Sequence, residues 1–299
     1  MNTKSGFVAI IGRPNVGKST LLNSLIGEKV SITADKPQTT RHRILGVHTQ
    51  GDNQMVFIDT PGMHLNDRKR INKHMNKAAN SALNDVELIL FVIEAFNWTR
   101  EDKAVLEKLN TVTAPVILLV NKVDKIYDKD KLLPFLAERS QDFKYTEIIP
   151  ISALRREQTD VLINNVEKYL IPGPFFFPQE QKTDVNLPFR LAEIIREKLT
   201  RNLLEELPYA LTVAIEHMQV NDKTNQLDIH AIIWVERASQ KSIVIGKNGA
   251  NLKLVGTLAR EDMNKLLDRR VHLKLWVKIR DNWSDNDQLL QSLGYIDLN

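Results

Sequence analysis

The sequence predicts an α/β domain with a mostly parallel sheet, followed by a smaller α+β domain. The chain has 299 residues, and at about 100–200 residues per domain this length suggests two domains. Apolar runs alternate with amphipathic stretches in the first half, whereas the second half contains strands of period two. Between the halves, the proline-rich residues 171–179 cannot continue a helix. We therefore predict domains over 1–171 and 187–280, a linker over 172–186 and an acidic tail over 281–299.

The first domain alternates short strands with helices. The predicted strands are Phe7–Ile11, Ile44–Gln50, Met55–Ile58, Leu88–Ile93, Val116–Val120 and Ile148–Ile151. The predicted helices are Lys18–Ile26, Arg68–Leu83, Glu101–Leu109, Asp130–Phe143 and Thr159–Leu170. Such alternation is typical of a parallel sheet with helices on both faces. We expect Ile44–Gln50 to be an edge strand, paired with its successor through the turn that starts at Gly51.

The second domain has the predicted order helix, strand, strand, short helix, helix, strand. Its helices are predicted over Arg190–Leu207, around Gln240–Ile245 and over Ala250–Leu267, and its strands over Leu211–Ile215, Leu227–Val235 and Val271–Ile279. In each strand one parity is apolar, which indicates a sheet with one covered face. Such sheets are usually antiparallel, so we expect a mostly antiparallel sheet.

Composition excludes several classes of protein. Hydrophobic residues make up 42% and charged residues 26% of the chain, as in ordinary globular domains. Cysteine is absent, which excludes disulfides, thiolate metal sites, iron–sulfur clusters and cysteine nucleophiles, and fits a cytoplasmic location. No apolar run approaches the ~20 residues of a membrane span, and the first apolar stretch is too short for a signal peptide.

Positive charge is concentrated in one region of the second domain. Residues 236–280 carry 11 lysines and arginines against 4 carboxylates, whereas the rest of the chain carries 30 against 33. A basic segment in an otherwise slightly acidic protein indicates a polyanionic partner such as nucleic acid.

A phosphate-binding loop follows the first predicted strand. The segment matches G-x-x-x-x-G-K-[S/T] and opens a predicted helix, which is the expected context for this motif. Backbone N–H groups and the helix N-terminus would hold phosphate oxygens, Lys18 would contact the β- and γ-phosphates, and Ser19 would ligate Mg²⁺. The predicted phosphate-binding residues are Gly12, Arg13, Pro14, Asn15, Val16, Gly17, Lys18, Ser19 and Thr20.

Two further segments complete a predicted triphosphate site. Asp59, Thr60, Pro61 and Gly62 end the strand Met55–Ile58; there the aspartate would reach Mg²⁺ through water, and the glycine N–H would face the γ-phosphate. The predicted first switch consists of Gln38, Thr39, Thr40, Arg41 and His42. Thr40 would ligate Mg²⁺ when the triphosphate is bound. Thr39 competes for this role, and we prefer Thr40, the residue directly before Arg41, by resemblance to related phosphate-loop proteins.

The base is predicted to be guanine. Asn121, Lys122, Val123 and Asp124 close the strand Val116–Val120. The Asp124 carboxylate can accept from guanine N1–H and the 2-amino group, whereas adenine would leave it unpaired. Asn121 would join this loop to the phosphate loop, and Lys122 would lie along the base. After the last strand, Ser152 and Ala153 would offer a backbone N–H to guanine O6.

A G-x-x-G loop joins two predicted helices in the basic region. It consists of Gly246, Lys247, Asn248 and Gly249, with Lys241 and Lys253 nearby. Within this order of elements the loop indicates a KH domain. Its glycines would let an RNA backbone approach closely, and the adjoining groove would hold about four unpaired nucleotides. A structural helix–helix turn is the alternative interpretation.

These motifs together resemble the Era family of bacterial GTPases over nearly the whole chain. The resemblance implies a small-GTPase-like domain followed by a type II KH domain. It also implies GTP hydrolysis to GDP and phosphate, binding of 16S rRNA near its 3′ end, and a role in assembly of the small (30S) ribosomal subunit. It further implies weak peripheral association with the inner membrane. Nothing in the sequence points to an obligate protein partner.

The resemblance leaves the catalytic groups open. Met63 follows Gly62, where other small GTPases carry a water-orienting glutamine. Arg13 and Arg41 are the candidates for an arginine finger, although a structural role is the simpler interpretation for both. Related GTPases with asparagine at the position of Asn15 use a potassium ion beside the phosphates. The alternative is that Asn15 bonds only within its own loop.

Two other functions are compatible with the same motifs. The chain could be an RNA-binding assembly factor in which hydrolysis is incidental, or a GTPase acting on another RNA. A tRNA-modification GTPase is excluded because the required cysteine is absent, and a tandem-domain ribosome GTPase because only one phosphate loop is present.

Overall fold

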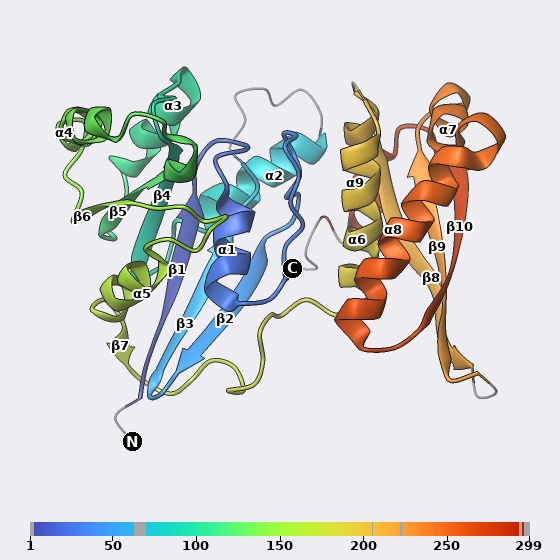
Figure 1. Cartoon of the computed structure of the whole chain (residues 1–299), viewed down its shortest axis with the longest axis horizontal. Helices are drawn as coiled ribbons and strands as arrows, with labels where there is room; N and C mark the ends of the chain where they lie inside the picture. Colours follow the sequence, from blue (N-terminus) through green and yellow to red (C-terminus); the bar gives the residue numbers. More distant parts are fainter. Residues whose placement is uncertain (1–2, 63–69, 205, 222–223, 293–294, 296–299) are drawn as a thin grey trace. The chain divides into compact units, whose positions relative to one another are not determined.

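The computed structural model describes residues 3–62, 70–204, 206–221, 224–292 and 295 (Figure 1). Its contacts divide the chain into two units. Unit 1 comprises Met1–Thr33, Thr40–Arg68 and Asn72–Asp184, and unit 2 comprises Ala34–Thr39, Lys69–Ile71 and Val185–Asn299. The two units are described separately below.

Unit 1 contains a seven-stranded sheet in the order β2-β3-β1-β4-β5-β6, with β7 paired to β1. The strands are β1 (Lys4–Ile11), β2 (Ile44–Gln50), β3 (Asn53–Asp59), β4 (Leu88–Glu94), β5 (Val116–Asn121), β6 (Glu147–Pro150) and β7 (Ile171–Pro172). Neighbouring strands from β3 to β6 run parallel, whereas β2 is antiparallel to β3. The predicted parallel sheet and its antiparallel edge hairpin are therefore confirmed.

Helices cover both faces of this sheet (Figure 1). They are α1 (Lys18–Ile26), α2 (Arg70–Ser81), α3 (Arg100–Leu109), α4 (Leu132–Ser140) and α5 (Thr159–Glu167), with 3-10 turns at Val123–Lys125 and Lys129–Lys131. Apolar side chains of α2, α3 and α4 pack with β1, β4 and β5 on one face, whereas α1 and α5 contact each other and β3. This arrangement buries both faces of the central strands, which explains their nearly continuous apolar sequence.

The segment after α5 packs along unit 1 instead of hanging free. The buried side chain of Gln54 accepts hydrogen bonds from the backbone N–H groups of Phe176 and Phe177, at 2.8 and 3.0 Å. Further along, the N–H of Val47 on β2 donates to the carbonyl of Lys182 at 2.8 Å. The predicted linker, residues 172–186, is thus held by unit 1 as far as Asp184.

Unit 2 has the predicted order of elements. They are α6 (Leu187–Asn202), β8 (Leu211–Asn221), β9 (Gln226–Val235), α7 (Ala238–Ile245), α8 (Ala250–Leu267), β10 (Val271–Ile279) and α9 (Asp287–Ser292), with 3-10 turns at Leu207–Tyr209, Lys247–Gly249 and Trp283–Asp285. The N-cap side chain of Asn186 accepts from the N–H of Phe189 at 3.0 Å, which starts α6 after the proline-rich segment.

The sheet of unit 2 corrects one expectation. Its order is β10-β9-β8, with β8 antiparallel to β9 but β10 parallel to β9. The prediction of a mostly antiparallel sheet was therefore wrong for one of the two pairings. The physical reason is the connection: α7 and α8 lie between β9 and β10, and such a helical crossover returns the chain in the parallel direction. The core lies on one face only, between the sheet and α6, α7 and α8.

The predicted acidic tail has a buried anchor. The indole of Trp283 is fully buried and donates to the carbonyl of Ala210 at 3.2 Å. Its ring centroid lies 5.9 Å from that of Tyr295, whose hydroxyl is 3.0 Å from the hydroxyl of Thr212. Trp283 and Tyr295 of the predicted tail therefore belong to the fold of unit 2.

Candidate nucleotide site and nucleic-acid interface

The phosphate loop connects β1 to α1 with a backbone that needs glycine at two positions. Gly12 has φ 149° and Gly17 has φ 103°. A Cβ at Gly12 would lie 2.3 Å from the carbonyl oxygen of Val92, and one at Gly17 would lie 2.3 Å from Nδ2 of Asn121. Both backbone conformation and space therefore exclude other residues. Because α1 starts at Gly17 without a side-chain cap, its first N–H groups remain for a ligand.

Lys18 lies inside this loop and holds its curvature. Its ammonium donates to the carbonyls of Gly12 at 3.0 Å and Arg13 at 2.9 Å. Burial lowers the pKa of Lys18 to about 8, although the nearby Asp59 carboxylate opposes this shift. Because burial disfavours the charged ammonium, phosphate oxygens bound beside it would stabilise its charge.

Four residues from separate segments bring their side-chain oxygens together at the end of β3. The Ser19 hydroxyl donates to Oδ2 of Asp59 at 2.7 Å and lies 2.6 Å from the hydroxyl of Thr40. The Ser31 hydroxyl donates to the same carboxylate oxygen at 3.0 Å. Thr39, the competing candidate, donates instead to the carbonyl of Lys36 at 2.6 Å. The structure therefore groups Thr40, and not Thr39, with Ser19 and Asp59.

The oxygen cluster suits Mg²⁺. Magnesium prefers hard oxygen ligands and commonly binds through few protein groups together with nucleotide phosphates. Oδ1 of Asp59 is buried and has no hydrogen-bond partner, so one carboxylate oxygen remains for a metal-bound water. Burial raises the pKa of Asp59, against the charge of Lys18 and the hydroxyl hydrogen bonds. Among the described residues no group of three or more His, Cys, Asp or Glu side chains could hold a metal.

The predicted base-binding residues meet at the carboxyl ends of β5 and β6. The Asn121 amide donates to the carbonyl of Val16 at 2.7 Å, and its oxygen accepts from the N–H of Ala153 at 3.0 Å. The Ser152 hydroxyl donates to Oδ1 of Asp124 at 2.6 Å. Asn121 thus joins the phosphate loop to both base-binding segments, and Ser152 orients the carboxylate predicted to read guanine.

Glu94 connects the base-binding loop to the phosphate loop. Its carboxylate is 2.9 Å from the ammonium of Lys122 and 3.1 Å from the guanidinium of Arg13, which also contacts Asp102 at 3.0 Å. Burial opposes ionisation, but these hydrogen bonds hold the pKa of Glu94 below its usual range. Because the Arg13 guanidinium bonds two carboxylates, its geometry favours the structural interpretation over an arginine finger.

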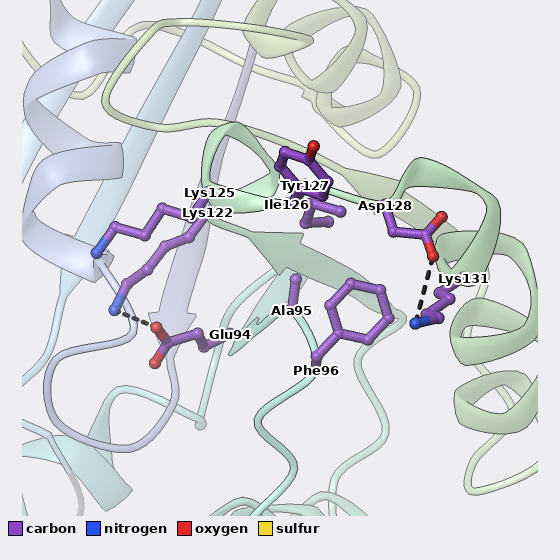
Figure 2. Close-up of a pocket in the computed structure, with 9 residues that line it drawn as sticks. All are labelled: Glu94, Ala95, Phe96, Lys122, Lys125, Ile126, Tyr127, Asp128 and Lys131. Atoms are coloured by element: carbon purple, nitrogen blue, oxygen red, sulfur yellow. Dashed lines mark ion pairs between the residues drawn. The ribbon is translucent and has the colours of Figure 1, made fainter.

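A cavity of about 230 Å³ adjoins this connection (Figure 2). Its lining residues are Glu94, Ala95, Phe96, Lys122, Lys125, Ile126, Tyr127, Asp128 and Lys131. Figure 2 shows Lys122 reaching toward Glu94 on one side, while the rings of Phe96 and Tyr127 lie on the other side. The ion pair therefore forms one wall of this cavity, next to the predicted base-binding loop.

The remaining switch residues are distributed between the two units. Gln38 and Thr39 belong to unit 2, whereas Thr40, Arg41 and His42 belong to unit 1. In unit 2, the buried Arg196 donates to the carbonyl of Thr39.

The second switch begins against the phosphate loop. The Thr60 hydroxyl donates to the carbonyl of Ile10 at 3.0 Å. A Cβ at Gly62 would lie 2.8–2.9 Å from atoms of Pro14, which brings the two loops into close contact. Met63 lies outside the described residues.

Ser31, Glu94 and Asp102 were not predicted as site residues. Ser31 lies in a loop without a motif, and no sequence signal distinguishes it from other serines. Glu94 did carry a signal, since it directly follows a fully apolar strand, as Asp59 and Asn121 do. Polar residues at the carboxyl ends of parallel strands meet at one edge of the sheet.

The G-x-x-G loop of unit 2 turns between α7 and α8. Gly246 has φ 74° and Gly249 has φ 77°. A Cβ at Gly246 would lie 3.0 Å from the backbone of Asn251, whereas at Gly249 nothing lies within 4 Å. Lys247, Asn248 and Lys253 are exposed, and Lys241 is half-buried. As at α1, helix α8 starts at a glycine without a side-chain cap.

Comparisons with known proteins agree with the division of the chain into a nucleotide-binding unit and a KH-type unit. A family model described as 50S ribosome-binding GTPase matches residues 7–122, and a KH domain model matches residues 206–284. GTPase Era of Actinobacillus pleuropneumoniae is 50% identical over 295 residues, which cover 99% of this chain and 97% of the relative. GTPase Era of Yersinia pestis is 48% identical over the same share.

Two solved structures of Era are similar along the whole chain. One is Era in complex with MgGDPNP and nucleotides 1506–1542 of 16S ribosomal RNA, and the other is an Aquifex aeolicus Era variant bound to GDP·AlF4⁻. Each is 38% identical with a TM-score of 0.94, and covers 98% of this chain and 99% of the other. By full-length identity, by fold and by the geometry of its loops, the chain belongs to the GTPase Era family.

Proposed function

We propose that this GTPase, which converts GTP and water to GDP and phosphate, is a switch that binds single-stranded 16S rRNA near its 3′ end and acts in small-subunit (30S) assembly. The observation that carries the proposal is the presence of both sites on one chain: the phosphate loop with its oxygen cluster, and the Gly246–Gly249 loop in a KH-type unit. The similar Era structure holds both a GTP analogue with Mg and this end of the RNA.

In the nucleotide site each group has a defined task. Lys18 supplies positive charge to the β- and γ-phosphates, and the N–H groups of the loop bind their oxygens. Ser19 and Thr40 present hydroxyl oxygens to Mg²⁺, which when bound neutralises charge on the phosphates. Asp59 accepts hydrogen bonds from both hydroxyls and thereby orients them. Asp124 selects guanine.

In unit 2, the loop Gly246–Gly249 binds the RNA backbone. Lys247 and Lys253 are exposed beside it, and the open space at Gly249 leaves room for a phosphate. The apolar side chains of Ile243 and Leu254 are 55% and 46% exposed on the flanking helices. Exposed apolar side chains beside lysines suit unpaired bases attached to phosphates.

The first experiment measures RNA affinity by fluorescence anisotropy in the presence of GDP and of a non-hydrolysable GTP analogue. A switch binds RNA with different affinities in the two states. Equal affinities would support instead an assembly factor in which hydrolysis is incidental.

The second experiment tests the loop. Lys247→Asp with Asn248→Asp adds repulsion and should weaken RNA binding, and each lost phosphate contact should reduce the salt slope by roughly 0.7. Basal GTP hydrolysis should stay unchanged. Lys265→Asp with Gln288→Asp makes the same charge change at exposed positions elsewhere in unit 2 and is the matched control. If circular dichroism shows both proteins folded, wild-type RNA affinity in the loop variant would refute the assignment.

Potassium is proposed as a further cofactor, beside the phosphates at Asn15. The backbone of Asn15 has φ 64°, in the left-handed region, and its position resembles that in potassium-dependent GTPases. A potassium ion there supplies the positive charge that an arginine finger supplies elsewhere. Hydrolysis should be faster in potassium than in sodium at equal ionic strength, and Asn15→Ala should remove the difference. Equal rates of the wild type in both salts would dismiss the ion.

For localisation, we propose a cytoplasmic protein with weak peripheral attachment to the inner face of the membrane, as the family resemblance implies. No helix among the described residues has both the length and the apolar character needed to cross a bilayer. The test is co-sedimentation with vesicles containing anionic lipid, with and without competing RNA. Absence of the protein from the vesicle pellet at low salt would exclude the attachment.

A further inference from the structure

Among the described residues, α6, α7 and α8 pack on one face of the sheet of unit 2, whereas the other face is met by Tyr295 at Thr212. Helices α6, α7 and α8 pack on the face formed by Ile229, Ile233 and the residues of the same parity. The opposite parity presents a different set of side chains, which we call the outer sheet face: His217, Asp228, His230, Trp234, Lys274, Trp276 and Lys278.

Aromatic rings form a continuous cluster on this face. The ring centroids of His217 and His230, paired across β8 and β9, are 5.0 Å apart. The His230 ring then meets Trp276 on β10 edge-on, at 5.1 Å. Trp276 is 42% exposed. A large indole left this open on a folded sheet is available to another flat ring.

Positive charge accompanies these rings. The twelve residues 269–280 contain five lysines and arginines and no carboxylate. The ammonium of Lys278 on β10 lies 5.7 Å from the centroid of the Trp234 ring. The guanidinium of Arg280, the residue after β10, lies 5.4 Å from the same centroid. Two carboxylates lie near this cluster. Glu216 lies 3.4 Å from Lys278, and Asp228 is the register partner of His272 at the far end of the face from Trp234.

Strand β10, which carries Lys274, Trp276 and Lys278 of the outer sheet face, is an edge strand and contacts helix α7. Helix α7 starts three residues after β9 ends and packs against β10 (Figure 1). Trp234 and Arg280 lie at that same end of the sheet, where the N–H of Arg280 donates to the carbonyl of Val235. Because α7 packs on the core face and β10 is an edge strand, an RNA strand held at the α7–α8 loop would pass around β10 to reach the outer sheet face.

We propose that the outer sheet face is a second RNA-binding surface, on which unpaired bases stack against Trp276 and His230 while Lys274 and Lys278 contact their phosphates. Its occupant is single-stranded RNA that extends beyond the nucleotides held at Gly246–Gly249, so the inference rests on the proposed function. Stacking rings between cations are how proteins bind unpaired strands without reading their sequence.

The test compares two single-stranded RNAs of mixed A and C sequence by fluorescence anisotropy. One has about 4 nucleotides, the length that a KH groove holds, and the other has about 12. Trp276→Ala should weaken binding of the longer RNA about tenfold, within the range measured for loss of one stacked base, and leave the shorter RNA unaffected. Lys274→Glu should weaken the longer RNA and lower its salt slope by roughly 0.7. Lys265→Glu, an equal charge change on α8, is the control.

The outcomes separate this proposal from the proposed function. If the wild type binds the longer RNA but both variants bind it equally well, the outer sheet face is not an RNA surface. If a variant weakens both RNAs to the same extent, its effect is on the whole unit and the proposal fails. If the wild type binds neither RNA, the proposed function itself fails. Should Trp276→Ala not fold, the exposed Lys274→Glu variant decides.

Discussion

The hydroxyl of Ser19 donates to Asp59 across 2.7 Å, although 40 residues separate the two in the chain. The contact joins the first turn of α1 to the end of β3. Asp59 bonds the hydroxyl and leaves its other oxygen without a partner. The fold therefore brings together two residues that the sequence predicts to act at the Mg²⁺ site.

Thr40→Ala should weaken GTP binding in the presence of Mg²⁺ by about tenfold, or ~1.4 kcal/mol, because one metal ligand is lost. GDP affinity should change little, since this threonine is expected to reach the metal only with the triphosphate. Thr39→Ala is the matched control, because its hydroxyl bonds the carbonyl of Lys36. Titration calorimetry measures all four affinities. A larger loss in Thr39→Ala than in Thr40→Ala would reverse the assignment.

Asp124→Asn should weaken GTP binding on the order of 100-fold, about 3 kcal/mol, because hydrogen bonds to a charged group are lost. The amide should instead gain affinity for XTP, which has a carbonyl where guanine has the amino group. Asp128→Asn changes a neighbouring exposed carboxylate and should leave both affinities unchanged. Unaltered GTP affinity in Asp124→Asn would show that another residue reads the base.

Glu94→Gln should weaken GDP and GTP alike by about tenfold, since the charge that orients both Lys122 and Arg13 is lost. The control is Glu107→Gln, an exposed glutamate on α3. Stopped-flow fluorescence measures the dissociation rate of a fluorescent GDP analogue, which should rise as the affinity falls. Release at the wild-type rate would mean that the two loops are held in place by Asn121 alone.

Nucleotide binding should take up protons near pH 8. In the free protein the pKa of Lys18 is lowered to about 8, and a bound phosphate raises it again. Below pH 8 Lys18 is charged in both states, so affinity is constant; above it the free form loses its proton first, and affinity falls as pH rises. Calorimetry with GDP in EDTA, in buffers of different ionisation enthalpy, should show more uptake at pH 8.5 than at pH 7. Equal uptake at both pH values would contradict the shift.

Much of the fold was predictable because apolar residues recur with one spacing in strands and with another in helices. Helices α1 and α8 begin and end where the sequence predicted, since glycine precedes each and the apolar spacing is regular. The direction of β10 was not predictable from alternation, which reports only that one face is buried. The helical crossover before it was the better guide.

The nucleotide site was predictable where a motif fixes residues relative to a strand end, as for Ser19, Asp59 and Asn121. Residues that act through tertiary contact were not: Ser31 reaches Asp59 only because its loop folds back onto β3. Likewise, the proline-rich segment has no periodicity, so nothing in its sequence showed that Gln54 would bind its backbone.

The chain between residues 171 and 184 also covers an exposed edge of the sheet of unit 1. Strand β2 is the outermost strand, and an exposed strand edge offers free backbone groups to other molecules, which leads to aggregation. Here Thr183 pairs with Gly46, and Lys182 accepts from the N–H of Val47. A fragment that ends at residue 171 uncovers this edge, whereas one that ends at 184 keeps it closed. The solubility of an isolated nucleotide-binding unit thus depends on the thirteen residues 172–184, which contribute nothing to its chemistry.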